Sequence, residues 1–278
     1  METLDPVSRL LDHVGMRAKT FYTGPLCGLH GFGADEGVGH LHVLRSGELQ
    51  AQCNGHQDIA VREPSLLFYP RPIDHRLNIE APLVADVLCA SVHYGVGMEN
   101  AITQSFPCVV VIPFSELEGM DTTLSLLFAE AGREEAGRQA MLDRLCDVLL
   151  IQIVRFAISR KLVAQGIIAG LSHPRLARCL TELLDAPERP WTLEAMASLA
   201  HLSRNGFAQV FRVVVGTTPG SFVTQVRVAR AQRLLTGGRP LALVAQDVGY
   251  SSQPAFSRAF IRELGISPSA WLRSPATK

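Results

Sequence analysis

The stretch ASLAHLSRNGFAQVFRVVVGTTPGSFV, residues 197–223, decides the fold, because a second copy of it follows at an offset of 49 residues. The copy is VAQDVGYSSQPAFSRAFIRELGISPSAW, residues 244–271. Self-similarity at a fixed offset is typical of a supersecondary unit that occurs twice. The residues shared by the two copies are Ser203, Phe207, Phe211, Gly216 and Pro219, which recur as Ser252, Phe256, Phe260, Gly265 and Pro268.

Each copy has the pattern of a short helix, a tight turn and a second helix. A serine is a favoured N-cap, and phenylalanines four positions apart share one face of a helix. The glycine then ends the second helix and the proline opens the next segment. The pattern predicts two helix-turn-helix units, at about 192–216 and 241–265, with a further N-cap at Thr192.

With the phenylalanines buried, each second helix exposes a polar face. Arginine, asparagine and glutamine side chains can make paired hydrogen bonds with base edges in the major groove of DNA. A single polar face is more simply explained by contact with solvent, but two at one offset favour binding of duplex DNA. The candidate contacts are Arg204, Asn205, Ala208, Gln209 and Arg212 in the first unit and Gln253, Pro254, Ser257 and Arg258 in the second.

The distribution of charge supports this hypothesis, although 26 Lys+Arg and 26 Asp+Glu cancel over the whole chain. Residues 1–172 contain 13 basic and 20 acidic side chains, whereas residues 173–278 contain 13 basic and 6 acidic ones. A basic segment suits contacts with phosphates. A helix at about 221–235 would join the two units, with Arg227, Arg230 and Arg233 facing outward, and place them about 10 base pairs apart on one face of DNA.

The N-terminal half has a different periodicity. Residues 22–94 consist of short apolar runs separated by Gly, Pro, Asn and Asp, a pattern typical of strands in a β-sandwich or barrel. From residue 121 the period is helical, and the long amphipathic run at 138–165 either packs on its own β domain or forms a dimer seam. We predict an α+β fold: a β-barrel sensor at 1–120, a helical dimerisation segment at 121–172 and an all-α DNA-binding domain at 173–278.

Both quoted stretches resemble the DNA-binding domain of AraC/XylS-type transcription regulators, and the resemblance covers the last hundred or so residues. It implies base contacts from Asn205, Ala208 and Gln209 in the first unit and from Pro254, Ser257 and Arg258 in the second. It also implies an activator, not an enzyme, that binds promoter DNA and contacts RNA polymerase.

The N-terminal half is similar to the cupin-type sensor domain of one branch of that family, which includes a regulator that responds to hypochlorous acid. The similarity is carried by GPLCG at Cys27, HLHVLRSGEL around His42, YPRPIDHRL at His75 and LCASV at Cys89. It implies that a pair of cysteines senses an oxidant. Cys89 matches one of the pair by position and Cys27 lies near the other, and oxidation of these thiols would alter the packing of the barrel.

The histidines leave alternatives open. His40 and His42 share one face of a strand, His75 falls in the second cupin motif, and His93 could join them. They could hold a divalent metal, contact a small organic ligand, or be core histidines. A further alternative is a cupin enzyme with a regulatory tail, but the usual first metal motif is incomplete.

The sequence also predicts a cytoplasmic protein. The N-terminus METLDPVSRLLDHVG lacks the pattern of a signal peptide, and the most apolar run, residues 145–158, is interrupted by Asp147, Gln152 and Arg155. In a reducing compartment the six cysteines are expected as thiols, and none of them form a CxxC pair.

Overall fold

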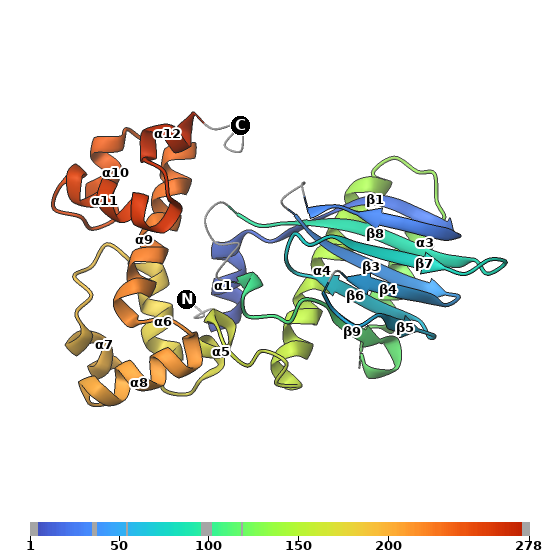
Figure 1. Ribbon diagram of the computed structural model, residues 1–278, viewed down its shortest axis with the longest axis horizontal. Helices are drawn as coiled ribbons and strands as arrows, with labels where there is room; N and C mark the ends of the chain where they lie inside the picture. The colour runs from blue at the N-terminus through green and yellow to red at the C-terminus, as the bar shows by residue number, and fades with distance from the viewer. Residues whose placement is uncertain (1–4, 35–37, 54, 96–101, 118, 274–278) are drawn as a thin grey trace. The chain divides into compact units, whose positions relative to one another are not determined.

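A computed structural model describes residues 5–34, 38–53, 55–95, 102–117 and 119–273 (Figure 1). The chain divides into two compact units. The strand unit comprises Gly15–Tyr94 and Phe106–Leu162, and the helical unit comprises Met1–Val14, Gly95–Ser105 and Val163–Lys278.

The boundary between the units differs from the expected one at residue 172. Helix α5 (Ile167–Ser172) packs on α6 (Ala177–Asp185) and therefore lies in the helical unit. Helix α1 (Pro6–Val14) also belongs to this unit, because it packs on α5 and α6. Apolar contacts made after the chain folds back, which periodicity does not show, decide both assignments.

The strand unit contains two antiparallel sheets, which form the barrel expected from the sequence. The five-stranded sheet has the order β1 (Arg17–Leu26), β8 (Ala85–His93), β3 (Gly39–Ser46), β6 (Ser65–Tyr69) and β9 (Val110–Pro113). The four-stranded sheet has the order β2 (Gly28–Phe32), β7 (His75–Ile79), β4 (Leu49–Cys53) and β5 (Ile59–Val61).

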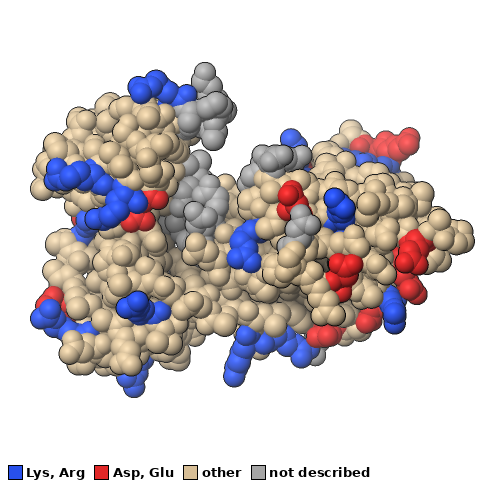
Figure 2. All heavy atoms as spheres, viewed as in Figure 1, with Lys and Arg blue, Asp and Glu red and all other residues tan. Residues whose placement is uncertain are grey.

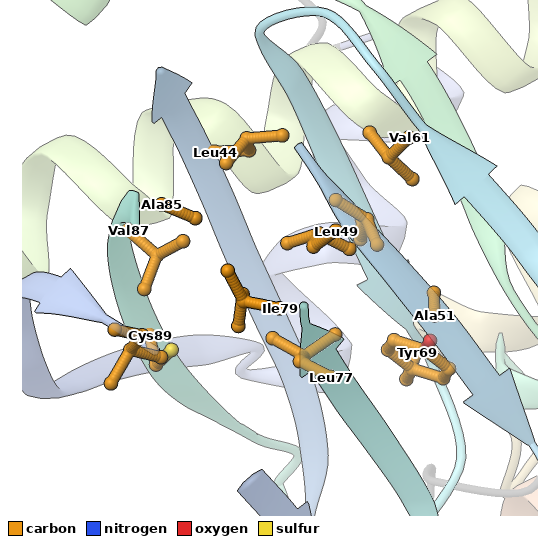
Figure 3. Close-up of a cluster of buried hydrophobic side chains, with 12 residues drawn as sticks. Leu44, Leu49, Ala51, Val61, Tyr69, Leu77, Ile79, Ala85, Val87 and Cys89 are labelled. Carbon is orange, nitrogen blue, oxygen red and sulfur yellow. The ribbon is translucent and has the colours of Figure 1, made fainter. Parts of the chain in front are cut away.

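Side-chain alternation gives the two sheets a common core. Along β7, His75, Leu77 and Ile79 are buried while Arg76 between them is exposed, as expected for a strand with one face inward. Figure 3 shows Leu77 and Ile79 among apolar side chains from both sheets, and Tyr69 and Cys89 belong to the same cluster. His42 of β3, His75 of β7 and Cys89 of β8 are buried and therefore lie in a largely apolar interior.

Two helices, α3 (Asp121–Ala131) and α4 (Arg138–Ser159), complete the strand unit. Strand β1 is at the edge of its sheet, and α4 satisfies part of its backbone: the amide of Ala18 donates to Asp147 Oδ1 at 2.7 Å and that of Thr20 to Asp143 Oδ1 at 2.8 Å. Covering an edge strand in this way prevents it from pairing with another chain.

The helical unit repeats one arrangement twice. The first helix-turn-helix unit consists of α7 (Leu193–Leu199) and α8 (Arg204–Val215). The second helix-turn-helix unit consists of α10 (Leu241–Asp247) and α11 (Gln253–Leu264). Helix α9 (Pro219–Thr236) joins them, and α12 (Pro268–Leu272) follows the second unit.

The N-caps predicted from the repeat are confirmed. Ser203 Oγ accepts from the amide of Gly206 at 3.2 Å, and Ser252 Oγ accepts from that of Ala255 at 3.4 Å. Thr192 caps α7 in the same way. Helices α8 and α11 both end at a left-handed glycine, with φ of 86° at Gly216 and 74° at Gly265.

The buried aromatic side chains repeat as well. The rings of Phe207 and Phe211 lie 5.4 Å apart, and those of Phe256 and Phe260 lie 5.6 Å apart. Each pair then packs on the aromatic ring of the following helix: Phe211 on Phe222, and Phe260 on Trp271. Within the described residues, no helix has the length and apolar character needed to cross a membrane.

Candidate functional site

The candidate DNA contacts of the first unit lie on α8, and most of them are exposed. Asn205 and Gln209 are exposed, and Ala208 between them is partly buried. Arg204 pairs with Glu194 of α7 at 2.9 Å, which holds its side chain at the N-terminal end of the helix. Arg212 is exposed in the last turn. The face is polar, open to solvent and supported from behind by the buried phenylalanines.

The equivalent face of α11 is also exposed. Gln253, Pro254 and Arg258 lie at the surface, and Ser257 is partly buried. Proline at this position occupies the first turn of the helix, where an amide is not needed for the intrahelical ladder. The sequence therefore presents matched surfaces on the two second helices, as the offset of 49 residues predicts.

The helical unit carries more basic than acidic side chains, 13 against 6 in residues 173–278. In Figure 2, Lys and Arg side chains spread over this unit with few carboxylates between them, whereas Asp and Glu gather on the strand unit. A surface of this charge attracts the phosphates of nucleic acid and makes binding dependent on salt.

The arginines of α9 do not all face solvent, which corrects the expectation for this helix. Arg227 donates to the carbonyl oxygens of Pro187 and Arg189, each at 2.7 Å. Arg230 pairs with Glu188 at 3.0 Å. Burial lowers the pKa of Arg233 from its ordinary value. The reason is that the loop between α6 and α7 folds back on α9, which sequence periodicity could not show.

The strand unit contains a buried chain of hydrogen bonds that begins at Cys89. The Cys89 Sγ lies 3.1 Å from His42 Nδ1, and His42 Nε2 lies 2.9 Å from His75 Nε2. The chain ends at the backbone, because His75 Nδ1 lies 2.9 Å from the carbonyl oxygen of Ile73. Register explains the first contact, since His42 of β3 pairs directly with Cys89 of β8.

The Ile73 carbonyl fixes the direction of this chain. A carbonyl oxygen only accepts, so His75 carries its proton on Nδ1 and, when neutral, accepts at Nε2. His42 must then donate from Nε2 and accept at Nδ1, where the available donor is the Cys89 thiol. The thiol proton therefore points at an imidazole nitrogen that can receive it.

Burial keeps all three groups neutral. It lowers the pKa of His75 to about 4. Burial, together with the electrostatic repulsion that a protonated His42 would meet at His75 and His40, holds the pKa of His42 well below its usual range. Burial also raises the pKa of the Cys89 thiol to about 12. At neutral pH the resting state is thus an uncharged thiol beside an uncharged base.

Aromatic rings surround the histidines. The His75 imidazole lies between the Tyr69 ring, 3.8 Å away and nearly parallel, and the Phe32 ring, 5.1 Å away. Phe32 and Phe21 both pack on His40. Sequence analysis did not identify these aromatic residues, although YPRPIDH places Tyr69 a few residues before His75.

A pocket of about 550 Å³ adjoins this cluster. His75 and Phe32 form part of its wall, so the end of the hydrogen-bond chain that is remote from Cys89 lies next to an open space. The remaining side chains at the pocket are mostly polar: Gln52, Cys53, His56, Asp58, Asp74 and Arg76.

The structure does not bring Cys27 to Cys89. Cys27 is exposed and follows β1, whose last residue, Leu26, pairs with Ala85. Ala85 and Cys89 are four residues apart on β8, which is roughly 13 Å at the rise of an extended strand. A disulfide needs Cα atoms within about 7 Å, so the two thiols cannot pair in this arrangement of the strand unit.

The structure also places His93 apart from the other histidines. His93 lies at the end of β8, where it contacts Ser91 at 2.9 Å and lines a different pocket with Arg17 and Lys19. The compact set is therefore His40, His42, His75 and Cys89.

The geometry of this set does not match a metal centre. Within the described ranges, no group of three or more His, Cys, Asp or Glu is arranged to hold a metal ion. The Nε2 atoms of His42 and His75 lie 2.9 Å apart and are hydrogen-bonded to each other.

Residues 5–159 match the family model described as cupin, and residues 196–274 match the model described as a helix-turn-helix domain. The crystal structure of the DNA-binding domain of AdpA in complex with a target DNA matches at 33% identity and a TM-score of 0.34, covering 36% of this chain and 90% of that one.

Two curated relatives match over most of their length. An uncharacterized HTH-type transcriptional regulator of Haemophilus influenzae is 29% identical over 262 residues, which is 86% of this chain and 88% of that protein. The RCS-specific HTH-type transcriptional activator RclR of Escherichia coli is 28% identical over 243 residues, which is 86% of this chain and 85% of that protein.

Proposed function

We propose that this chain, which belongs to the cupin family and is a DNA-binding transcription regulator of the AraC type, activates transcription in response to an oxidant. It would do so in the cytoplasm as a homodimer that binds promoter DNA and contacts RNA polymerase. The exposed apolar residues Met141, Val148 and Ile151 on one side of α4 support the dimer.

DNA binding is assigned to α8 and α11. This assignment rests on one observation: α8 and α11 each expose a polar face, and both helices lie in the same basic unit. In the proposed complex, Asn205 and Gln209 of α8 and Arg258 of α11 make hydrogen bonds with base edges, and the other arginines contact phosphates. Ala208 contributes an apolar contact and Pro254 fixes the first turn of α11.

Oxidant sensing is assigned to Cys89, and its support is the contact of the thiol with His42. Hypochlorous acid, the oxidant suggested by the related activator, would chlorinate the sulfur: an S–Cl bond forms and the Cl–O bond breaks. The thiol proton passes through His42 and joins the hydroxide as water. A second water then replaces chloride and yields a sulfenic acid and HCl.

The oxidised sulfur no longer fits the resting hydrogen-bond chain. A sulfenic acid is larger than a thiol and carries an additional polar oxygen, which the packed interior between β3 and β8 does not accommodate. The pairing of these strands would shift, and with it the equilibrium between two states of the regulator. Cys27, which is exposed, is the second proposed sensing thiol. In the resting strand unit it would react with a partner other than Cys89.

A second candidate signal is a small polar ligand in the pocket beside His75. The polar lining and the volume of about 550 Å³ favour this alternative. It predicts that a ligand raises the unfolding temperature and that variants lacking Cys27 or Cys89 still respond.

The test is a footprint of the full chain on the DNA upstream of its own gene, reduced and after brief treatment with hypochlorous acid. Wild type, Cys27→Ser and Cys89→Ser are compared with Cys146→Ser, which removes another buried thiol whose pKa burial raises to about 12. We expect oxidation to change the footprint of wild type and Cys146→Ser but not of Cys89→Ser. Identical footprints for all proteins in both states would contradict thiol sensing.

A further inference from the structure

The second helix-turn-helix unit contacts the loop that leads into the first unit, in addition to being joined to that unit by α9. The loop at 186–191, which connects α6 to α7 and so leads into the first unit, lies against the turn between α10 and α11 of the second unit. Gly249 forms this turn with a φ of 83°. A Cβ on Gly249 would lie 2.3 Å from the carbonyl oxygen of Glu188, so the two backbones touch.

Arg227 of α9 holds this contact together from the side. Its Nε donates to the carbonyl of Pro187 and its Nη2 to that of Arg189, both at 2.7 Å. The same guanidinium lies over the Tyr250 ring, with Cζ 5.3 Å from the ring centre. One side chain of the joining helix thus touches both the loop that leads into the first unit and the turn of the second unit. Arg230 adds its ion pair with Glu188.

The same turn in the first unit shows what is particular to Gly249. The backbone hydrogen bonds of the two turns correspond at an offset of 48 residues: the amide of His201 donates to the carbonyl oxygen of Ser198, and that of Gly249 to the carbonyl oxygen of Gln246. Both residues are left-handed, with φ of 52° at His201 and 83° at Gly249. The left-handed turn therefore belongs to the helix-turn-helix itself. His201 carries an exposed side chain, whereas at Gly249 the 186–191 loop leaves no room for one.

Helix α9 packs directly on the second unit, since Val228, Ala231 and Leu235 of α9 share one buried cluster with the apolar side chains of α10 and α11. On the first unit, the Phe222 ring of α9 packs on Phe211 of α8. The guanidinium bonds of Arg227 and the backbone contact at Gly249 add a second connection, between the loop that leads into α7 and the second unit.

We propose that Arg227 is a positioning residue that fixes α8 and α11 relative to each other, and so sets the spacing between the two DNA half-sites that the protein accepts. This inference rests on the proposed binding of DNA by both helices. Because one base pair moves a half-site by about 3.4 Å and about 35° around the duplex, a rigid pair of readers discriminates strongly between spacings. If α8 and α11 can move relative to each other, the protein binds its native site less tightly but tolerates a changed spacing between the half-sites.

The experiment uses the full chain and its footprinted upstream DNA, with one base pair inserted or deleted between the two protected half-sites. Affinity is measured for wild type, Arg227→Ala, Arg227→Lys and the control Arg178→Ala, which removes an arginine of α6 that bonds to Glu182 of the same helix. Circular dichroism and the unfolding temperature establish that each variant is folded. Lysine retains the charge but not the two-pronged geometry, so it isolates the role of the guanidinium.

We expect altered spacing to weaken wild type and Arg178→Ala by about tenfold or more. For Arg227→Ala the native site should bind several-fold less tightly and the penalty for altered spacing should fall to about threefold or less, with Arg227→Lys between the two. An unchanged penalty in folded Arg227→Ala or Arg227→Lys would overturn the proposal, even if overall affinity falls. Failure of wild type to bind any site would instead refute the proposed DNA binding itself.

Discussion

The Sγ of Cys89 lies 3.1 Å from Nδ1 of His42, and the two residues face each other across the β3–β8 ladder. This contact joins a buried thiol to a neutral base and, through His75, to the wall of an open pocket. We therefore expect chemistry at the sulfur to act directly on the packing of two central strands.

Removing the base should slow the reaction of the thiol. In His42→Leu, Cys89 loses the acceptor of its proton, and we expect its oxidation by hypochlorous acid to slow by about 10²-fold, the lower end of general base effects. Mass spectrometry of quenched samples gives the rate. His93→Leu, remote from Cys89, is the control; equal rates in the two variants would show that the contact has no chemical role.

Stability should fall as the pH falls from about 6.5 to about 4. The pKa of His75 is lowered to about 4 in the folded chain, whereas unfolded histidine titrates near 6.5. The unfolded state therefore binds more protons in this window, and acid favours unfolding by about 3 kcal/mol from this group. Denaturant unfolding of wild type and His75→Asn should show a shallower pH dependence for the variant; parallel curves would contradict the burial of a neutral His75.

The two serine caps should contribute equally to the helical unit. Ser203→Ala and Ser252→Ala each leave a helix N-terminus without its side-chain acceptor, which costs about 1 kcal/mol. Chemical denaturation monitored by the tryptophan fluorescence of this unit measures the loss. The control Ser269→Ala replaces an exposed serine within α12 and should lower the free energy of unfolding much less. Similar losses of stability in all three variants would argue against the caps.

Substitutions at base contacts and at phosphate contacts should differ in how the affinity for DNA depends on salt concentration. Asn205→Ala should weaken binding to the native site by about 1–3 kcal/mol and relax discrimination at one base pair, with an unchanged salt slope. Arg212→Ala should weaken binding to all sequences and reduce the slope by about one. Anisotropy titrations at several salt concentrations measure both. Identical behaviour of the two variants would be inconsistent with the proposed roles.

The helical unit was predictable because its signals are local. A serine cap, a pair of phenylalanines and a terminal glycine each act within a few residues, and their repetition at one offset removed the ambiguity that a single copy would leave. Arg227 was the exception: its carbonyl partners at Pro187 and Arg189 lie in a loop about forty residues earlier.

The sensor was less predictable because its contacts depend on strand register. The sequence shows that His40 and His42 share a face, but only the pairing of β3 with β8 sets His42 against Cys89. The same register separates Cys27 from Cys89, so two thiols that are related by family resemblance are not neighbours in the strand unit.

The most direct test of DNA reading by two paired helices is a footprint of the full chain on its own upstream DNA, with wild type beside Asn205→Ala and Arg258→Ala. We predict two protected major-groove segments about 10 base pairs apart for wild type. Each substitution should weaken protection first at a different one of the two segments. A single protected segment, or a footprint that neither substitution alters, would contradict the account.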